Sequence, residues 1–152
     1  MKKIKLTNGE YTLVDKEDYN YLKNFKWLKR SNYVGYVKQK NKKQTTILMH
    51  RLIMNAKKGE IIDHINRNPL DNRKKNLRLS NKSKNAANCK IHKHNTSGYK
   101  GVSKYRNKFK AYIVKNNKQI HIGCFYTKKE AAIAYNKKAL ELFGKHANLN
   151  EV

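Results

Sequence analysis

The sequence carries far more positive than negative charge, and this excess limits what the chain can fold into. Its 152 residues include 36 lysines and arginines but only 10 aspartates and glutamates, a formal net charge of +26. Because self-repulsion on this scale destabilises a compact state, the charge implies a polyanionic partner, with nucleic acid the leading candidate. Hydrophobic residues make up 38% of the chain, enough for small cores but not for a large enzyme with one deep interior.

Lysine supplies most of the positive charge, and arginine accounts for only six residues. Lysine is a flexible point charge that suits phosphates, whereas the planar guanidinium of arginine reads guanine better. This balance favours salt-sensitive binding to the nucleic-acid backbone over dense base readout. A codon bias toward lysine, asparagine and isoleucine would also raise the lysine content.

The hydrophobic residues are dispersed along the chain. No apolar run approaches the ~20 residues that a membrane span requires, and no signal-peptide-like segment follows Met1. We therefore expect an intracellular protein with no membrane partner. Cys89 and Cys124 form no C-x-x-C motif, so neither a disulfide nor a four-cysteine zinc site is expected.

A polar stretch from Lys93 to Gly98 contains no apolar residue and ends in turn-forming residues, which predicts a domain boundary. We expect one domain over residues 1–92 and a second over residues 96–152. Both are basic, so both are expected to contact the same polyanion.

The first domain begins with the pattern of a β-hairpin, because alternating apolar residues flank Asn8-Gly9. Asp15 resembles the N-cap of a helix over residues 16–25. Periodicity predicts strands at residues 27–28 and 33–37, and it fits residues 47–54 to either a buried strand or a helix.

The second domain has a cleaner pattern, in which strand alternation gives way to helical spacing after Thr127. Thr127 and Glu130 predict a capping box, and Gly144 predicts the end of the helix. The sequence therefore predicts three antiparallel strands packed on one helix, and an α+β class for the whole chain. The strand residues expected to face this helix are Phe109, Ala111, Ile113, Ile120, Ile122 and Cys124.

The pair Asp63-His64 is conspicuous in a chain with so few acids. Hydrolysis of a phosphodiester needs a base for the attacking water and a cation on the phosphate. A neutral imidazole suits the first task, and carboxylate and amide oxygens suit Mg²⁺. Asp63, His64 and a later asparagine would be sufficient for both.

The order Asp63, His64, Asn76, Asn85 resembles that of the HNH endonucleases, particularly the phage and intron-borne homing branch, over about residues 46–92. The resemblance implies a ββα-metal nuclease module extended by the N-terminal hairpin. It implies that His64 is the general base and that Asp63 and Asn85 are metal ligands. Asn76 would bridge the loop and orient the base.

The chain departs from many members of that family at the third motif position, where Asn85 stands in place of histidine. An amide oxygen favours a hard cation, Mg²⁺ or Mn²⁺, over a histidine-rich zinc site. Asn88, one helical turn further on, is the alternative ligand. Arg73 and Arg78 are candidate phosphate clamps beside the site, although arginines at such positions are often only solvated.

The other histidines lack ligand-like spacing. His50 is expected to be a packing residue beside Arg51. The remaining histidines are expected on the surface: His92, His94, His121 and His146.

An ordered series of motifs over residues 96–150 is similar to the Apetala-two/ethylene-response-factor DNA-binding domain. The motifs are Tyr99–Val102, Phe109–Ile113, Ile122–Phe125, Glu130–Ala132 and Ala134–Asn136, followed by Gly144, Ala147 and Asn148. In that family a three-stranded sheet lies in the DNA major groove with a helix packed behind it. The resemblance implies that the following residues face DNA: Lys100, Lys104, Arg106, Lys108, Lys110 and Tyr112.

Several arginines and a tryptophan of the plant domains are replaced here by lysine, serine or tyrosine. Base specificity should therefore be poorer, or depend on Tyr105, Arg106, Gln119 and His121. A merely solvated strand face is an equally good interpretation of Lys108 and Lys110.

These patterns favour a DNA endonuclease, a monomer or homodimer encoded by a phage or mobile element and acting in a bacterial cytoplasm. One site per chain predicts nicking of double-stranded DNA, unless two copies meet across the duplex, with 5′-phosphate and 3′-hydroxyl products. Two other interpretations stay open. One is a non-catalytic DNA-binding regulator or accessory protein, and the other is a ribosome- or RNA-associated protein.

Overall fold

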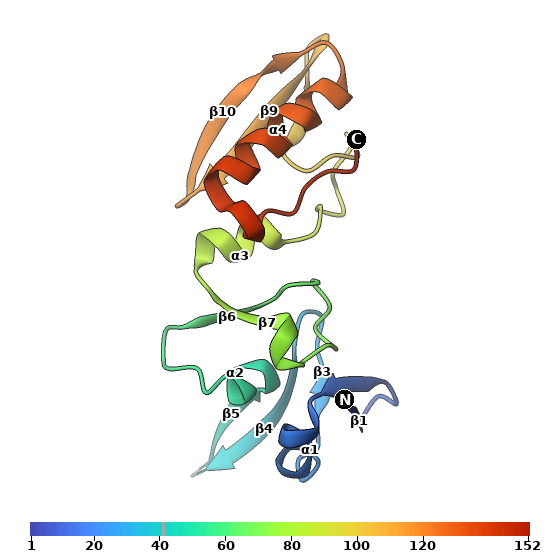
Figure 1. The fold of residues 1–152 in the computed structure, drawn as a ribbon, viewed down its shortest axis with the longest axis vertical. Helices are drawn as coiled ribbons and strands as arrows, with labels where there is room; N and C mark the ends of the chain where they lie inside the picture. Colours follow the sequence, from blue (N-terminus) through green and yellow to red (C-terminus); the bar gives the residue numbers. More distant parts are fainter. Residues whose placement is uncertain (41) are drawn as a thin grey trace. The chain divides into compact units, whose positions relative to one another are not determined.

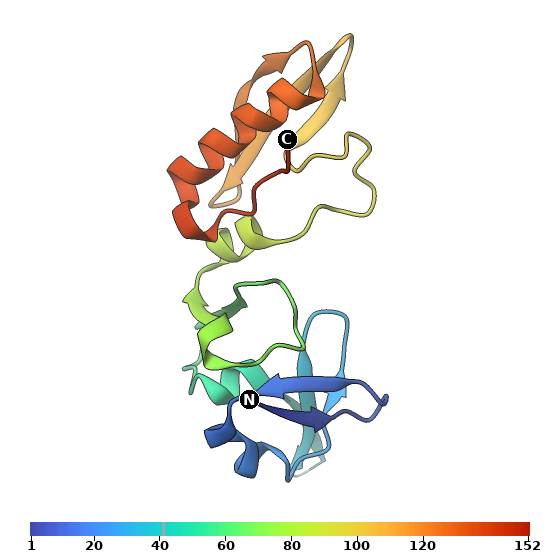
Figure 2. The ribbon, with the colours of Figure 1, turned by 45° about the vertical axis from the view of Figure 1, so that its right-hand side comes forward.

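The structure, a computed structural model, describes residues 1–40 and 42–152 and divides into two compact units, Met1–Ser80 and Asn81–Val152. Each unit combines short antiparallel sheets with helices (Figures 1 and 2), which confirms the predicted α+β class. No helix in these described ranges is long and apolar enough to cross a membrane. The predicted domains, residues 1–92 and 96–152, stay a prediction.

The first unit begins with the predicted hairpin, formed by β1 (Lys2–Lys5) and β2 (Tyr11–Val14). Gly9 supplies the positive φ of +86° that this turn requires. The following helix, α1 (Lys16–Leu22), is shorter than predicted. Asp15 makes no side-chain cap bond to this helix; instead, its Oδ2 accepts a hydrogen bond from the backbone N–H of Lys74.

A three-stranded antiparallel sheet follows, in the order β3 (Leu28–Lys29), β4 (Val34–Lys40), β5 (Lys43–Leu48). The segment that fitted both strand and helix is divided between them, because β5 ends at Leu48 and α2 (Met49–Ile53) begins at the next residue. Trp27 is fully buried in this unit, and its indole N–H donates to the carbonyl of Leu22. The buried core is Ile4, Leu6, Val14, Leu22, Trp27, Val34 and Met49.

The unit ends with a two-stranded antiparallel sheet of β6 (Ile61–His64) and β7 (Leu77–Ser80), joined by a loop and the short 3₁₀ helix η1 (Lys74–Asn76). The register places Asp63 opposite Arg78. An isolated parallel bridge between Leu13 and Asp71 attaches the loop to β2.

The second unit begins with α3 (Lys82–Asn88), whose N-cap is the side chain of Asn81. The strands β8 (Val102–Tyr105), β9 (Lys108–Lys115) and β10 (Lys118–Phe125) form a sheet in the order β10-β9-β8. The helix α4 (Lys128–Phe143) covers one face of this sheet, as both views show (Figures 1 and 2), and the 3₁₀ helix η2 (Gly144–His146) follows it. The predicted capping box of Thr127 and Glu130 is present.

Two sequence predictions for this unit are wrong. A β-bulge between His121 and Gly123 shifts the register, so Cys124 pairs with Lys110 and is exposed rather than facing the helix. His146, predicted on the surface, is buried at the end of α4. In both cases a local irregularity or a tertiary contact overrides the pattern.

Gly101 lies under the helix at a position where a side chain cannot fit. Its φ is +72°, and an added Cβ would lie 2.6 Å from the carbonyl oxygen of Tyr112 and against the ring of Tyr135. We predict that Gly101→Ala destabilises the second unit by about 2–5 kcal/mol, from backbone strain and overpacking together. Hydrogen exchange of the β9 amides measures this loss.

Gly98→Ala is the matched control, because Gly98 has a similar φ of +79° but no atom within 4 Å of an added Cβ. It should cost only about 1–2 kcal/mol. Equal effects of the two substitutions would contradict the proposed clash.

Candidate active site and DNA-binding face

Asp63 and His64 are the last two residues of β6, and both are buried. The cross-strand pairing brings Arg78 of β7 to Asp63, whose Oδ2 accepts hydrogen bonds from Nε at 3.0 Å and from Nη2 at 2.8 Å. Only 7% of the Asp63 side chain and 12% of the Arg78 side chain are exposed. The predicted metal ligand therefore carries an arginine counter-ion in this structure.

The imidazole of His64 is held by an asparagine of the loop. Its Nε2 lies 3.2 Å from Oδ1 of Asn72, a residue with no exposed surface. Burial lowers the pKa of His64 below its ordinary value, against the opposing effects of the Asn72 hydrogen bond, Asp63 and Asp71. A neutral ring able to accept a proton is the form that a general base requires.

A second histidine lies beside His64. The rings of His50 and His64 are 5.2 Å apart in an edge-to-face arrangement at 77°. Burial, with His64 and Arg51 nearby, lowers the pKa of His50 to about 4. The buried position agrees with the packing role expected for His50, and it makes the ring a neutral neighbour of the candidate base.

The loop after β6 is closed by side-chain amides. Asn76 donates from Nδ2 to Oδ1 of Asn66 and to the carbonyl of Asp71, and its Oδ1 accepts from the backbone N–H of Asn66. These bonds hold the loop across ten residues. The further role expected for Asn76, orienting the base, stays a prediction.

The two arginines predicted as phosphate clamps both bind carboxylates of the fold. Arg73 donates to both carboxylate oxygens of Asp71, each at 2.6 Å, and this contact lowers the pKa of Asp71. Arg78 pairs with Asp63. Their guanidinium groups thus balance two buried carboxylates, and phosphate contact by either arginine stays a prediction.

Asn85 and Asn88 lie on a helix, α3, as the resemblance implied; Asn85 is half-buried and Asn88 is buried. This helix belongs to the second unit, whereas Asp63 and His64 belong to the first. That Asn85, or Asn88 in its place, binds a metal together with Asp63 stays a prediction.

The side chains near Asp63 suit a cation with few protein ligands. In residues 1–40 and 42–152, the one group of three His, Cys, Asp or Glu side chains close enough to hold a metal is Asp15, Glu17 and Asp18, and Lys74 already binds it. A site based on Asp63 would therefore offer one carboxylate, together with the amide oxygen of whichever α3 asparagine the prediction brings to it. This donor set fits Mg²⁺, which keeps several of its waters, and not a zinc site.

The sheet of the second unit has an open face opposite α4. Register places Lys108, Lys110 and Tyr112 of β9 on this face, because the alternate residues Ala111 and Ile113 are buried against the helix. Tyr105, Gln119 and His121 share it by pairing. Lys108 and Lys110 give this face positive charge, and residues 102–125 contain no acid to offset it.

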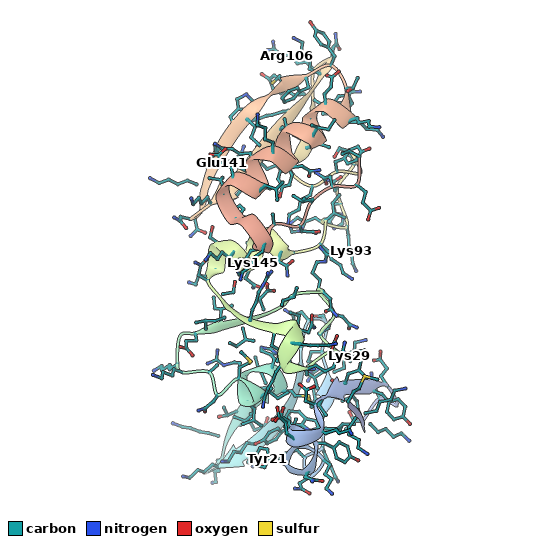
Figure 3. All side chains as sticks on the ribbon, in the orientation of Figure 1. Tyr21, Lys29, Lys93, Arg106, Glu141 and Lys145 are labelled. Carbon is teal, nitrogen blue, oxygen red and sulfur yellow. The ribbon has the colours of Figure 1, made fainter. Side chains whose placement is uncertain are left out.

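The remaining residues of the predicted DNA-binding set lie elsewhere. Arg106 lies at the tip of the β8–β9 hairpin (Figure 3), with its guanidinium 5.6 Å from the ring centre of Tyr105. Lys104 pairs with Phe109 and so lies on the α4 side of the sheet. The Lys100 ammonium donates to the carbonyls of Ala87 and Cys89 at the end of α3, which gives it a structural contact.

Sequence reasoning missed two residues of the His64 environment, Asn72 and Thr12. Thr12 lies 60 positions from Asn72 and contacts it through the amide. The sequence offered one indication of Thr12, a hydroxyl residue at an inward-facing position of the predicted hairpin.

Comparisons with known proteins identify the family of this chain. Residues 48–87 match the family model of the HNH endonuclease. An uncharacterized HNH endonuclease of Acanthamoeba polyphaga mimivirus is 34% identical over 149 residues, which cover 95% of this chain and 76% of the relative. Protein 3.8 of Escherichia phage T7 is 44% identical over 64 residues, 41% of this chain and 53% of the relative. No solved structure matches.

The chain therefore belongs to the HNH endonuclease family. Members of this family generally use a divalent metal ion, and DNA is the substrate that a nuclease domain of this kind implies. The family match includes His64 and Asn85 and ends at residue 87, so it says nothing of the sheet and α4 in the second unit.

The depressed pKa of His50 predicts a loss of stability in mild acid. The unfolded chain binds a proton near pH 6.5, which the folded state does not take up until about pH 4. The free energy of unfolding should therefore fall across this window, by at most about 3 kcal/mol from this residue, and be fully regained at neutral pH. Urea unfolding followed by Trp27 fluorescence measures it in the first unit.

His50→Gln should reduce this pH dependence and leave the part that comes from His64, whereas His92→Gln, at an exposed position, should not change it. An unchanged pH dependence in His50→Gln would show that His50 titrates normally in the folded state.

Proposed function

We propose that this protein is a metal-dependent endonuclease of the homing type that nicks or cleaves double-stranded DNA. The observation that carries the proposal is the buried neutral imidazole of His64, adjacent to the Asp63 carboxylate on the same strand, within the segment that matches the HNH family. Its relatives in a giant virus and a phage support a virus- or phage-encoded role in an infected host cell.

His64 acts as the general base in this proposal. The ring takes a proton from water, and the resulting hydroxide attacks phosphorus and breaks the bond to the 3′ oxygen. The departing 3′ oxygen takes a proton from solvent, which leaves 5′-phosphate and 3′-hydroxyl ends. Asp63 and Asp71 stabilise the imidazolium as it forms, since both favour the protonated ring. Asn76 keeps the loop closed around the base through its bonds to Asn66 and Asp71.

Asp63 and Asn85 would hold the divalent cation, Mg²⁺ or Mn²⁺, with Asn88 as the alternative to Asn85. When bound, the cation supplies positive charge to the phosphate and the leaving oxygen. Arg78 already neutralises Asp63, so the cation has to share this carboxylate with the guanidinium or displace it.

Nicking of supercoiled plasmid in Mg²⁺ tests the proposal. His64→Ala should lower the rate at least about 100-fold, because it removes the base. Asp63→Asn and Asn85→Ala should raise the Mg²⁺ concentration needed for half-maximal rate, and a chelator should abolish nicking.

His92→Ala, at an exposed histidine, is the control and should keep the wild-type rate. Undiminished nicking by His64→Ala would show that His64 is not the general base. Nicking in the presence of chelator would show that the reaction needs no metal ion. A shift in Mg²⁺ dependence with Asn88→Ala, but not with Asn85→Ala, would reassign the second ligand.

The second unit is proposed as an Apetala-two-like anchor that lays the open face of its sheet on duplex DNA. The lysines of this face and the absence of acids on all three strands support the proposal. Lys108 and Lys110 would contact phosphates. Tyr112 follows them on the same face of β9 and pairs with His121 of β10.

The salt dependence of duplex binding tests this anchor. Replacing Lys108 and Lys110 by glutamine should lower the slope of log K against log salt by about 2, since each lost phosphate contact removes about 0.9. Replacing Lys129 and Lys137, exposed on α4, is the matched control and should leave the slope unchanged. Equal slopes for the two double variants would place the DNA elsewhere.

A non-catalytic DNA-binding regulator is the second candidate function. The ion pair of Asp63 with Arg78 favours it, because the carboxylate meant for a metal is already compensated. This alternative predicts normal duplex binding with no nicking in Mg²⁺ or Mn²⁺.

A further inference from the structure

The contacts of the Asn72 side chain determine which of its ends faces His64. Its Nδ2 lies 2.9 Å from the carbonyl oxygen of Pro69 and 2.9 Å from Oγ1 of Thr12. A carbonyl oxygen only accepts hydrogen bonds, so the amide NH₂ must point toward Pro69. The carbonyl end of Asn72, Oδ1, therefore points at His64.

The Thr12 hydroxyl reinforces this orientation. Its single proton is donated to the carbonyl of Leu70 at 2.9 Å, so its oxygen is left to accept from Asn72. The backbone is fixed as well, because the N–H of Leu13 donates to Leu70 and the N–H of Asn72 donates to Leu13. Both Thr12 and Asn72 are fully buried, so water does not compete for these bonds.

An acceptor at 3.2 Å requires that Nε2 of His64 carry the proton. A neutral imidazole has one N–H, so the nitrogen with the lone pair is then Nδ1. We propose that Asn72, oriented by Pro69 and by Thr12 of the N-terminal hairpin, holds His64 as the Nε2–H tautomer and fixes the orientation of its ring. Asn72 and Thr12 are thus positioning residues, and their role in cleavage rests on the proposed function of His64.

Nitrogen NMR of the metal-free, DNA-free full chain at pH 8 tests the tautomer without any need for activity. His64 should show a protonated Nε2 and an unprotonated Nδ1, with its signals assigned by their loss in His64→Gln. Asn72→Ala should change this pattern to a mixture or to the Nδ1–H form. A protonated Nδ1 in the wild type, or an unchanged pattern in Asn72→Ala, would overturn the inference.

Thr12 offers a milder pair of variants, in case Asn72→Ala does not fold. Thr12→Val removes the hydroxyl at nearly constant shape, and Thr12→Ser keeps it. In plasmid cleavage, Thr12→Val should lower kcat about 10-fold with KM unchanged, and Thr12→Ser should restore it. Equal kcat values for the two variants at equal Trp27 unfolding temperature would remove Thr12 from the proposed positioning.

The NMR and cleavage results separate the two proposals. A wild-type protein with the expected tautomer but no nicking in Mg²⁺ or Mn²⁺ would refute the nuclease function and leave the hydrogen-bond assignment intact. Cleavage with the opposite tautomer would refute the assignment and leave the nuclease function intact.

Discussion

The hydrogen bonds between β2 and the loop after β6 are the contact on which the candidate site depends. Two neighbouring backbone bonds and the Thr12 hydroxyl attach this loop to the N-terminal hairpin. The loop in turn carries Asn72, which binds the imidazole of His64. Because an unsatisfied buried polar group costs about 1–3 kcal/mol, the hairpin and the loop stabilise each other only in this register. The N-terminal segment is therefore part of the site and more than an extension of the nuclease core.

Arginine and lysine divide their tasks in this chain. Arg73 and Arg78 each bind a buried carboxylate, and Arg51 donates to the backbone carbonyls of Ala56, Lys57 and Glu60. The rigid, multidentate guanidinium suits such positions. Most lysines stay on the surface, where a flexible point charge suits the phosphate backbone. Half of the six arginines are thus used by the fold itself.

The sequence predicted correctly those features that depend on interactions between residues close together in the chain. The turn at Asn8-Gly9 and the capping box at Thr127 involve residues within a few positions of each other, and both were predicted correctly. Asp15 is the N-cap residue of α1 as predicted, but a tertiary contact with Lys74 takes its side chain away from the helix. The predicted surface position of His146 was wrong. The bulge that turns Cys124 outward leaves no mark in the alternation of apolar residues.

The candidate site shows the same division. Its reactive groups are adjacent in sequence, so Asp63-His64 could be singled out by residue type alone. The partners that set their chemistry come from other segments: Arg78 across the sheet, Asn72 from the loop, and Thr12 from the hairpin. The sequence pattern identifies the reactive residues, whereas the residues that contact them are known only from the fold.

The pairing of two histidines has a consequence for proton transfer. If His64 accepts a proton during cleavage, the imidazolium forms 5.2 Å from the ring of His50. A second cation at that distance would oppose the transfer. Burial keeps the pKa of His50 near 4, so this neighbour stays neutral at the pH at which His64 works. Asp63 and Asp71 then favour the protonated ring of His64, and His50 packs against it without adding charge.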